Sequence, residues 1–417
     1  MTKINLIHPT GNPNARNAAL SISELGMLNA IATTFVHDPD RFDNQIGQLL
    51  KRLSPKLTST IEKELSRRTW IAPEGSKIYD YPWQEIFRIF LVKAKLSKKL
   101  GITDRTLVDW MVASFDRHVA KHHLKNIDAI YAYEDGAAET FTAAKQLGIY
   151  CFYELPIAFH VTSRRIQTEE AELFPELAST MMAVNEPEWK IEHKNREVEL
   201  ADHIFVPSSF TQRSLLDIGV SHSKITIIQY GAPIEYFEPR PKQDRIFRAM
   251  FAGQVSTRKG AHYLLQAWQE LRLPDSELLL VGFNQLPSDW LAKYSYHIRM
   301  TGSVPHSTLN EYYSSSSVFV FPSLVEGLAL VQLEAMSCGI TLITTSNAGG
   351  NDLITDGVEG FIIPIRDVEA IKTKLEWCYS HPQELADMGR AARQKAEQLT
   401  WELYRQKLAM VIKEKIG

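Results

Sequence analysis

Two carboxylates, Glu326 and Glu334, are separated by seven residues of turn and helix character. Gly327 follows the first of them, and because glycine has no side chain, the backbone there can approach a ligand closely. We expect a helix to begin near Leu328, so that its unpaired N–H groups and positive dipole end form an anion site. Glu334 then lies in the second turn, where its two oxygens can accept from the vicinal hydroxyls of a ribose. These residues predict a nucleotide with phosphates as the ligand.

The elements around these carboxylates read as strand, turn, helix and strand. Residues 318–321 are all apolar and predict a buried parallel strand, and residues 340–344 predict the next one. Open α/β sheets bind ligands at the carboxyl ends of their strands, which is where this turn lies. The glycine loops at 302, 327 and 349–350 alternate with predicted strands, so we expect all of them at one edge of one sheet.

A basic loop bounded by glycines precedes this region. Residues 247–252 predict a buried strand, and a helix is predicted over residues 261–271. Arg258 and Lys259 lie between them, at the end of a loop that begins with Gly253. Cations at a helix N-terminus suit a diphosphate, which carries several negative charges.

The run Glu-Gly-Leu-Ala-Leu-Val-Gln-Leu-Glu-Ala-Met at 326–336 is similar to the E-x7-E signature of the retaining GT-B glycosyltransferases, most closely glycosyltransferase family 4. The resemblance covers the chain from about residue 202 to near the C-terminus, and the N-terminal half only loosely. It implies that Glu326 contacts the donor sugar, that Glu334 holds the ribose and that Lys259 meets the leaving phosphate.

The chain departs from the family pattern at two positions. Ala329 stands where a second glycine is usual, and Gln254 stands where an arginine is usual, so Arg258 is expected to supply the second charge. The family places contacts to the base in the segment that contains Val304. We therefore expect a catalytic group of Lys259, Glu326 and Arg258, and a donor side that consists of Gly253, Lys259, Val304, Gly327, Leu328, Ala329, Leu330 and Glu334.

A length of 417 residues suits two domains. The expected fold is α/β of the GT-B kind, with two doubly wound Rossmann-like domains that face an interdomain cleft. We expect an acceptor-binding domain at 1–238 with a helical insert at about 45–123, a nucleotide-sugar-binding domain at 245–400, and a C-terminal helix at 401–417 that crosses back to the first domain. The Pro-rich, charged residues 238–244 form the predicted linker.

The acceptor side is expected in the first domain. Gly11 and Arg16 belong to the first predicted βα turn, which borders the cleft in the GT-B fold. Asp135 and Glu154 follow two later predicted strands, at positions where the family often has histidines, and His160 is the nearest histidine, in a predicted loop. For each of these residues a purely structural role stays open.

Composition excludes several classes of function. The net charge of −3 gives no general attraction to nucleic acid, and three widely spaced cysteines argue against a disulfide framework or a zinc site. Asp38 and Asp40 form a D-x-D pair, which we interpret as a loop and not as a metal site. No metal or cofactor is expected. The N-terminus leads directly into a predicted strand and no apolar run is long enough to span a membrane, so we expect a cytoplasmic protein without a signal peptide.

One segment carries an excess of positive charge. Residues 51–100 contain 12 Lys or Arg and 5 Asp or Glu. One interpretation is that this basic, partly amphipathic helical segment contacts the inner face of a membrane or an anionic acceptor. The simpler interpretation is that its charged side faces solvent and its apolar side packs on the core.

The expected function is metal-independent transfer of a sugar, with retention, from a nucleotide-sugar donor to a glycan, a lipid-linked sugar or a small molecule. Two alternatives stay open: a sugar-nucleotide epimerase, and a non-catalytic nucleotide-sugar-binding subunit.

Overall fold

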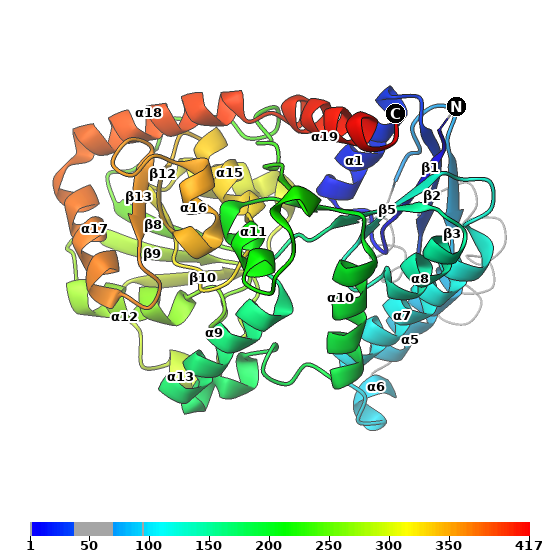
Figure 1. Cartoon of the computed structure of the whole chain (residues 1–417). Coiled ribbons are helices and arrows are strands. Elements are labelled where there is room, and N and C mark those ends of the chain that lie inside the picture. The colour runs from blue at the N-terminus through cyan, green and yellow to red at the C-terminus, as the bar shows by residue number, and fades with distance from the viewer. Residues whose placement is uncertain (1, 37–69, 94–95) are drawn as a thin grey trace, which may run out of the picture. The chain divides into compact units, whose positions relative to one another are not determined.

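Two β-sheets organise the computed structural model, which describes residues 2–36, 70–93 and 96–417 (Figure 1). The first sheet has seven strands, and its pairs from β3 through β6 are parallel. In spatial order its strands are β3 (Lys77–Asp80), β2 (Leu28–Thr33), β1 (Ile4–Ile7), β4 (Ala129–Tyr133), β5 (Tyr150–Glu154), β6 (His203–Val206) and β7 (Ile225–Ile227). The chain reverses its direction of winding between β1 and β4, as in a doubly wound fold.

The second sheet has six strands, all parallel. In spatial order they are β10 (Ile298–Gly302), β9 (Ser276–Val281), β8 (Phe247–Ala252), β11 (Val318–Phe321), β12 (Thr341–Thr345) and β13 (Gly360–Ile363). Here the winding reverses between β8 and β11, so the loops that follow these two strands lie next to each other. The two Rossmann-like sheets confirm the predicted α/β fold class.

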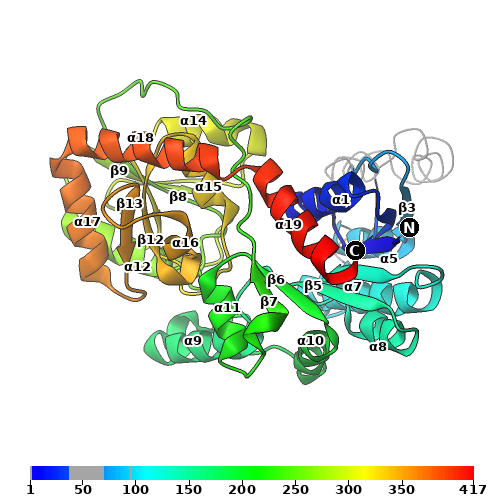
Figure 2. The same ribbon diagram turned by 45° about the horizontal axis from the view of Figure 1, so that its top comes forward.

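Helices flank both sheets. Around the first sheet lie α1 (Pro13–Glu24), α5 (Pro82–Lys93), α6 (Leu96–Lys99), α7 (Asp104–His122), α8 (Ala138–Gln146), α10 (Glu188–Leu200) and most of α19 (Trp401–Ile416). The other helices of the described residues are α9 (His160–Leu173), α11 (Ser209–Leu216), α12 (Ala261–Leu271), α13 (Ser288–Leu291), α14 (Leu309–Ser314), α15 (Leu330–Ser337), α16 (Gly350–Leu353), α17 (Val368–Ser380) and α18 (Pro382–Gln398). Helices α12, α15, α17 and α18 surround the second sheet (Figure 2). Short 3-10 helices occupy Pro175–Thr180, His222–Lys224, His306–Thr308 and Ser346–Ala348.

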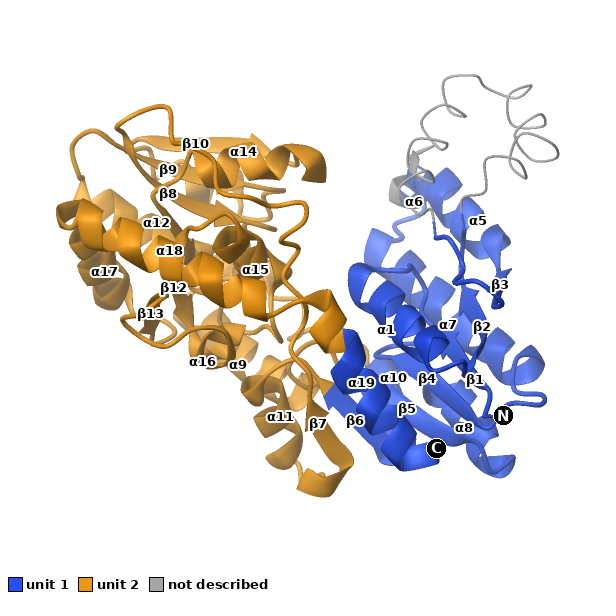
Figure 3. Cartoon of the chain, turned by 90° about the horizontal axis from the view of Figure 1, so that it is seen from above, with its two compact units in different colours: residues 1–154, 188–205, 405–417 blue, residues 155–187, 206–404 orange. Residues whose placement is uncertain are grey.

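The chain separates into two compact units (Figure 3). Unit 1 contains Met1–Glu154, Glu188–Phe205 and Arg405–Gly417, and unit 2 contains Leu155–Pro187 and Val206–Tyr404. Within unit 1, the C-terminal segment is held on α1, because Arg405 donates to Glu24 at 2.8 Å and its carbonyl accepts from Ser21 at 2.7 Å. The predicted domain bounds at residues 238, 245 and 400 stay predictions.

A strand lies inside the segment predicted as a helical insert. β3 is an edge strand whose residues alternate between exposed and half-buried, so no apolar run marks it in the sequence. Residues 45–69 of the predicted helical insert, which include the first part of the basic segment, and the D-x-D pair Asp38 and Asp40 fall outside the described residues.

Helix α9 begins at His160, so the prediction of a loop at this residue was wrong. The face that α9 buries is largely polar, with Ser163, Gln167 and Glu170 on it, so hydrophobic periodicity does not reveal the helix. Phe159 is its N-cap residue and offers no capping side chain, so the usual sequence signal for a helix start is also missing. Among the helices of residues 2–36, 70–93 and 96–417, none has the length and apolar content of a membrane span.

Candidate functional site

The loops after β8 and β11 meet at the reversal point of the second sheet. Gly253 follows β8 with a φ of +118°, a backbone conformation that residues with a side chain rarely adopt. A Cβ atom there would lie 3.3 Å from the Lys259 ammonium. Gly260 caps α12 with a φ of +67°, and a Cβ atom on it would lie 1.9 Å from the Pro322 carbonyl oxygen. Both glycines therefore make room, one for the lysine and one for the close approach of the two loops.

Three charged side chains converge where these loops meet. Arg258 Nη1 lies 2.8 Å from Glu326 Oε1, and Lys259 Nζ lies 3.2 Å from the same oxygen. Burial alone would raise the pKa of Glu326, but the positive charges of Arg258 and Lys259 outweigh it and hold this pKa below its usual value. The site thus keeps one carboxylate ionised between two cations, at the edge where the sequence predicts a diphosphate.

Further contacts hold the basic loop in place. The Arg258 guanidinium also donates to the Val325 carbonyl at 2.7 Å, and the Arg258 carbonyl accepts from the Leu324 N–H at 2.9 Å. The Lys259 ammonium lies 5.0 Å from the centre of the Phe321 ring, within cation–π range. The cations are therefore positioned before any ligand binds, and no reorganisation of the loop is needed to present them.

Gly327 lies where three chain segments of unit 2 come together. A Cβ atom on it would lie 1.9 Å from the Pro156 carbonyl oxygen and 3.0 Å from Pro207, and one on Gly349 would lie 3.0 Å from the Gly327 carbonyl oxygen. Helix α15 starts at Leu330, two residues later than predicted, and its N-cap residue Ala329 gives no side-chain hydrogen bond. The Ala329 side chain therefore caps none of the N–H groups of the first turn, of which that of Gln332 donates to the Ala329 carbonyl at 3.0 Å, and the neighbouring Leu328 is buried.

Glu334 is buried in α15 and forms a second cluster with two rings. Its Oε2 accepts from the Tyr313 hydroxyl at 2.9 Å, and its Oε1 lies 3.0 Å from His306 Nε2. The hydrogen bond to Glu334 raises the pKa of His306 above its usual value, although partial burial opposes it. The His306 side chain is 66% exposed, so the carboxylate lies behind a residue that solvent reaches. Val304 is half-buried in the loop after β10, at the same carboxyl edge.

In unit 1, the predicted acceptor residues Gly11 and Arg16 lie in the loop after β1. Gly11 has a φ of +64°, and a Cβ atom on it would lie 2.4 Å from the Trp70 ring. Arg16 Nε donates to the Gly11 carbonyl at 2.9 Å. Sequence reasoning missed His8, which ends the same strand: its Nδ1 accepts from the Gly11 N–H at 2.8 Å, and burial lowers its pKa to about 3. Its position as the last residue of the strand predicted over residues 3–8 was the available signal.

Asp135 follows β4 with a φ of +74° and lies in a buried network of charges. Its carboxylate lies 2.9 Å from Lys190 Nζ and 3.6 Å from Lys194 Nζ, and its N–H donates to Glu197 at 3.1 Å. Burial raises the pKa of the neighbouring Glu134 to about 7, because the charge of Lys194 offsets it only in part. The cations come from α10, some 55 residues later in the chain, so the sequence alone does not pair them with β4.

The last two predicted acceptor residues are buried. Glu154 ends β5, and its Oε2 accepts from the Tyr131 hydroxyl at 2.6 Å. His160 is the first residue of α9, with its ring 4.3 Å from that of Phe159. The structure therefore brings together Gly253, Arg258, Lys259 and Glu326, places Glu334 in a separate cluster, and buries Glu154 beside Tyr131 and His160 beside Phe159.

Comparison with known proteins gives a match to the part of the chain that contains Arg258, Lys259, Glu326 and Glu334. Residues 234–395 match the family model described as glycosyl transferases group 1. The GDP-mannose-dependent α-(1-6)-phosphatidylinositol monomannoside mannosyltransferase of Mycolicibacterium smegmatis is 31% identical over 152 residues, which cover 33% of this chain and 39% of that protein. The D-inositol 3-phosphate glycosyltransferase of Kribbella flavida is 26% identical over 53% of this chain and 58% of that protein. The matches thus span about half the length of these relatives.

Solved structures with a similar fold extend over the whole chain. Sucrose-phosphate synthase from Thermosynechococcus elongatus superposes with a TM-score of 0.64 at 19% identity and covers 99% of each chain. Anabaena HepE in complex with UDP superposes with a TM-score of 0.63 at 14% identity, covering 99% of this chain and all of that one. At these identities the similarity shows the fold, which is that of the GT-B glycosyltransferases.

Proposed function

We propose that this protein is a retaining glycosyltransferase that moves a sugar from a nucleoside diphosphate sugar to a sugar-containing acceptor without a metal ion. The observation that carries this proposal is the group of Arg258, Lys259 and Glu326 at the reversal point of the second sheet. Relatives support the donor class, since the matched mannosyltransferase is named for GDP-mannose and the HepE structures hold UDP or UDP-glucose.

In this proposal the donor's diphosphate lies against Lys259 and the start of α15. Glu326 engages one N–H of the Lys259 ammonium, which leaves two donors for phosphate oxygens. The uncapped N–H groups of the first turn of α15 offer further donors and a positive dipole end. These groups neutralise the leaving diphosphate, a role that a metal ion plays in other transferases.

The nucleoside is proposed to lie at Glu334. Both carboxylate oxygens already accept one hydrogen bond, from Tyr313 and from His306, and each oxygen has a lone pair left for a ribose hydroxyl. The exposed His306 ring can move aside or remain as a contact to the base, next to Val304.

The proposed reaction exchanges one bond at the anomeric carbon for another on the same face. The bond between this carbon and the diphosphate oxygen breaks, and a bond to the acceptor oxygen forms. The acceptor's proton passes to the leaving phosphate oxygen, so that charge and atoms balance. Glu326, fixed by Arg258 and Lys259, is proposed to contact hydroxyls of the donor sugar.

Unit 1 is proposed to bind the acceptor. The residues after β1 and β4 and the last residue of β5 lie at one edge of its sheet because these strands are parallel, and they include His8, Gly11, Asp135 and Glu154. A glycan, a lipid-linked sugar and a small molecule such as an inositol phosphate are all acceptors of this class. The names of the relatives include a phosphatidylinositol mannoside and D-inositol 3-phosphate.

Contact of unit 1 with a membrane surface is also proposed, on a specific feature of α5. Trp83, Phe87 and Phe90 recur at helical spacing and are 67%, 51% and 38% exposed, while Ile86 and Ile89 on the other face are buried. Aromatic residues on an outer helix face are typical of helices that lie in a membrane interface.

Helix α7 continues this face. The Trp110 ring lies 6.3 Å from that of Phe87, and the exposed Arg117 and Lys121 follow Trp110 on the same side of α7. Aromatic rings with cations beside them fit the boundary of an anionic lipid bilayer. A cytoplasmic location, at the inner face of the membrane, stays part of this proposal.

The test is an assay of nucleoside diphosphate release from UDP-glucose, UDP-galactose and GDP-mannose, with and without added sugar acceptors. Release that requires an acceptor, and a product whose anomeric proton coupling matches that of the donor, would support the proposal. Conversion of the donor sugar without an acceptor would indicate an epimerase. Tight donor binding without any turnover would indicate a binding subunit, and an inverted product would refute retention.

A further inference from the structure

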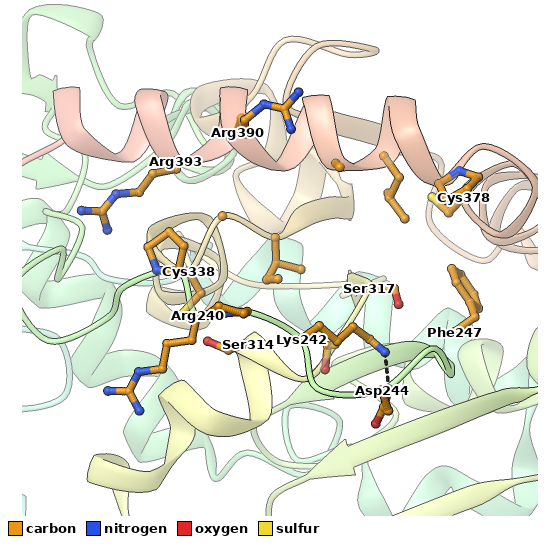
Figure 4. Close-up of a pocket in the computed structure, with 18 of the residues that line it drawn as sticks. Arg240, Lys242, Asp244, Phe247, Ser314, Ser317, Cys338, Cys378, Arg390 and Arg393 are labelled. Atoms are coloured by element: carbon orange, nitrogen blue, oxygen red, sulfur yellow. Dashed lines mark hydrogen bonds and ion pairs between the residues drawn. The ribbon is translucent and has the colours of Figure 1, made fainter.

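A groove of about 1200 Å³ lies in unit 2 away from the candidate site (Figure 4). Its floor includes Phe247, Ser317 and Ile340, which stand at the amino ends of β8, β11 and β12. Gly253 and Gly327 follow the carboxyl ends of β8 and β11, so the groove occupies the opposite edge of the same parallel sheet. One wall is the segment 239–246 and the other is helix α18, and we call this space the linker groove.

The linker groove concentrates positive charge in a chain whose net charge is −3. Its lining contains five cations against three acids. Two of these acids are already engaged by inner cations: Asp244 pairs with Lys242 at 2.7 Å, and Glu397 pairs with Arg393 at 2.7 Å. Arg393 also donates to the Ser337 carbonyl at 2.6 Å, which ties α18 to the end of α15. Each of these two ion pairs lies within one wall, and the contact to Ser337 fixes α18 against α15.

Three guanidinium groups of the lining are exposed to solvent. Arg240 and Arg245 belong to the linker wall, and Arg390 belongs to α18. The Arg240 and Arg390 side chains are 49% and 63% exposed, and the carboxylates with which they pair, Glu238 and Asp387, are exposed too. Ion pairs of this kind contribute little, so both guanidinium groups can exchange their partner for a ligand.

A buried polar atom also lines the groove. Ser314 is 7% exposed, and its Oγ has no hydrogen-bond partner among the residues that the structure describes. A buried hydroxyl without a partner is unfavourable, so a ligand that bonds to Ser314 would satisfy it. Figure 4 shows Ser314 in the lower part of the groove, near Arg240.

The rest of the floor is apolar. The Phe247 and Tyr379 rings meet edge to face at 5.4 Å, and Ile340 and Leu385 also line the groove. Cys378 lies among them, and burial raises the pKa of its thiol to about 12, so it is not a reactive group. Apolar area beside exposed cations favours an organic anion over a bare inorganic ion.

We propose that the linker groove binds a small organic molecule that carries a phosphate or carboxylate group. The anion would be bound by exposed guanidinium groups of the lining, Arg245 and Arg390 among them, with a hydroxyl or carbonyl of the ligand at Ser314. Arginine can form bidentate contacts with a phosphate or with a carboxylate, so the same side chains could bind a ligand of either kind. This inference does not depend on the proposed transferase function, because none of these residues belongs to the donor site.

The experiment is calorimetric titration of the full chain with ribose 5-phosphate, with citrate and with uncharged ribose. Binding of either anion and not of ribose is expected. Arg245→Glu and Arg390→Glu should each weaken it at least about tenfold, since a favourable charge becomes a repulsive one. Lys293→Glu makes the same charge change on an exposed residue outside the groove and should leave binding unchanged.

Two further variants separate the alternatives. Ser314→Ala should weaken binding without lowering the thermal midpoint, because it removes a hydroxyl that has no partner. Lys259→Ala should leave binding intact. The proposal is overturned if neither anion binds at millimolar concentration, or if binding survives both arginine variants and is lost in Lys259→Ala, which would assign the anion to the donor site.

Discussion

Glu326 Oε1 lies 3.2 Å from the Lys259 ammonium, although 66 residues lie between them in the chain. This contact exists because β8 and β11 are neighbours in the sheet, so that the loops after them share one edge. It orients the lysine and keeps the carboxylate ionised.

The first prediction concerns this lysine. Lys259→Ala should lower kcat by about 10²–10³-fold, because the charge on the leaving diphosphate would lose its main partner. The rate of nucleoside diphosphate release measures kcat. Lys293→Ala serves as the control, since Lys293 is an exposed residue outside the site. Turnover close to that of the unchanged protein would remove Lys259 from the mechanism.

The second prediction concerns the nucleoside. Glu334→Ala should weaken binding of the nucleoside diphosphate by about 1–3 kcal/mol, because a charged acceptor of ribose hydroxyls is lost. Tyr313→Phe should weaken nucleoside diphosphate binding less than Glu334→Ala does, since Tyr313 holds one carboxylate oxygen of Glu334 in place. Calorimetry with UDP and GDP measures both, and equal affinities in the unchanged protein and in Glu334→Ala would contradict the role of Glu334.

The third prediction concerns pH and the charge network of unit 1. Burial would lower the pKa of His193, but Asp116 and Glu197, at 3.3 and 3.4 Å from its Nε2, raise it to about 10. A raised pKa stabilises the fold fully below the ordinary value of 6.5, and this contribution is lost as the pH rises toward about 10. Urea unfolding at pH 6.5, 8 and 9.5 should therefore show a steeper loss of stability in the unchanged protein than in His193→Gln. If the free energy of unfolding falls equally with pH in both proteins, His193 is not the group that causes the pH dependence.

The fourth prediction concerns the aromatic face of α5. Trp83→Ser and Phe87→Ser should each reduce binding to vesicles of phosphatidylglycerol and phosphatidylcholine by about tenfold, because each removes a large apolar side chain from the contact. Tyr236→Ser and Phe283→Ser change exposed aromatic residues of unit 2 and should have no effect. Co-sedimentation measures binding. If the unchanged protein does not bind these vesicles and Phe87→Ser converts a dimer to a monomer in gel filtration, the aromatic face is a protein interface.

Local patterns were enough for much of the second sheet. β8, β11 and α12 begin and end where predicted, since a buried parallel strand is apolar throughout and α12 is bounded by a glycine and a polar turn. The glycines at 253 and 327 were recognisable because only glycine fits such close approaches. The start of α15 was placed two residues early, because Ala329 is not a capping residue and leaves no signal.

Other features could not be read from the chain. The polar face of α9, the pairing of α10 lysines with Asp135 and the two rings on Glu334 all depend on polar contacts between distant segments. Hydrophobic periodicity reports which side of an element is buried, and it does not report which charged groups meet there.

The sequence by itself determined the two sheets and the residues proposed to bind a nucleotide, because strand burial, glycine positions and charge spacing are local properties. Only the tertiary structure decided that Arg258 and Lys259 share one carboxylate, that Glu334 is held by Tyr313 and His306, and that cations gather again at the far edge of the sheet. The order of strands brings these groups together, and strand order follows from long-range packing that no local pattern records.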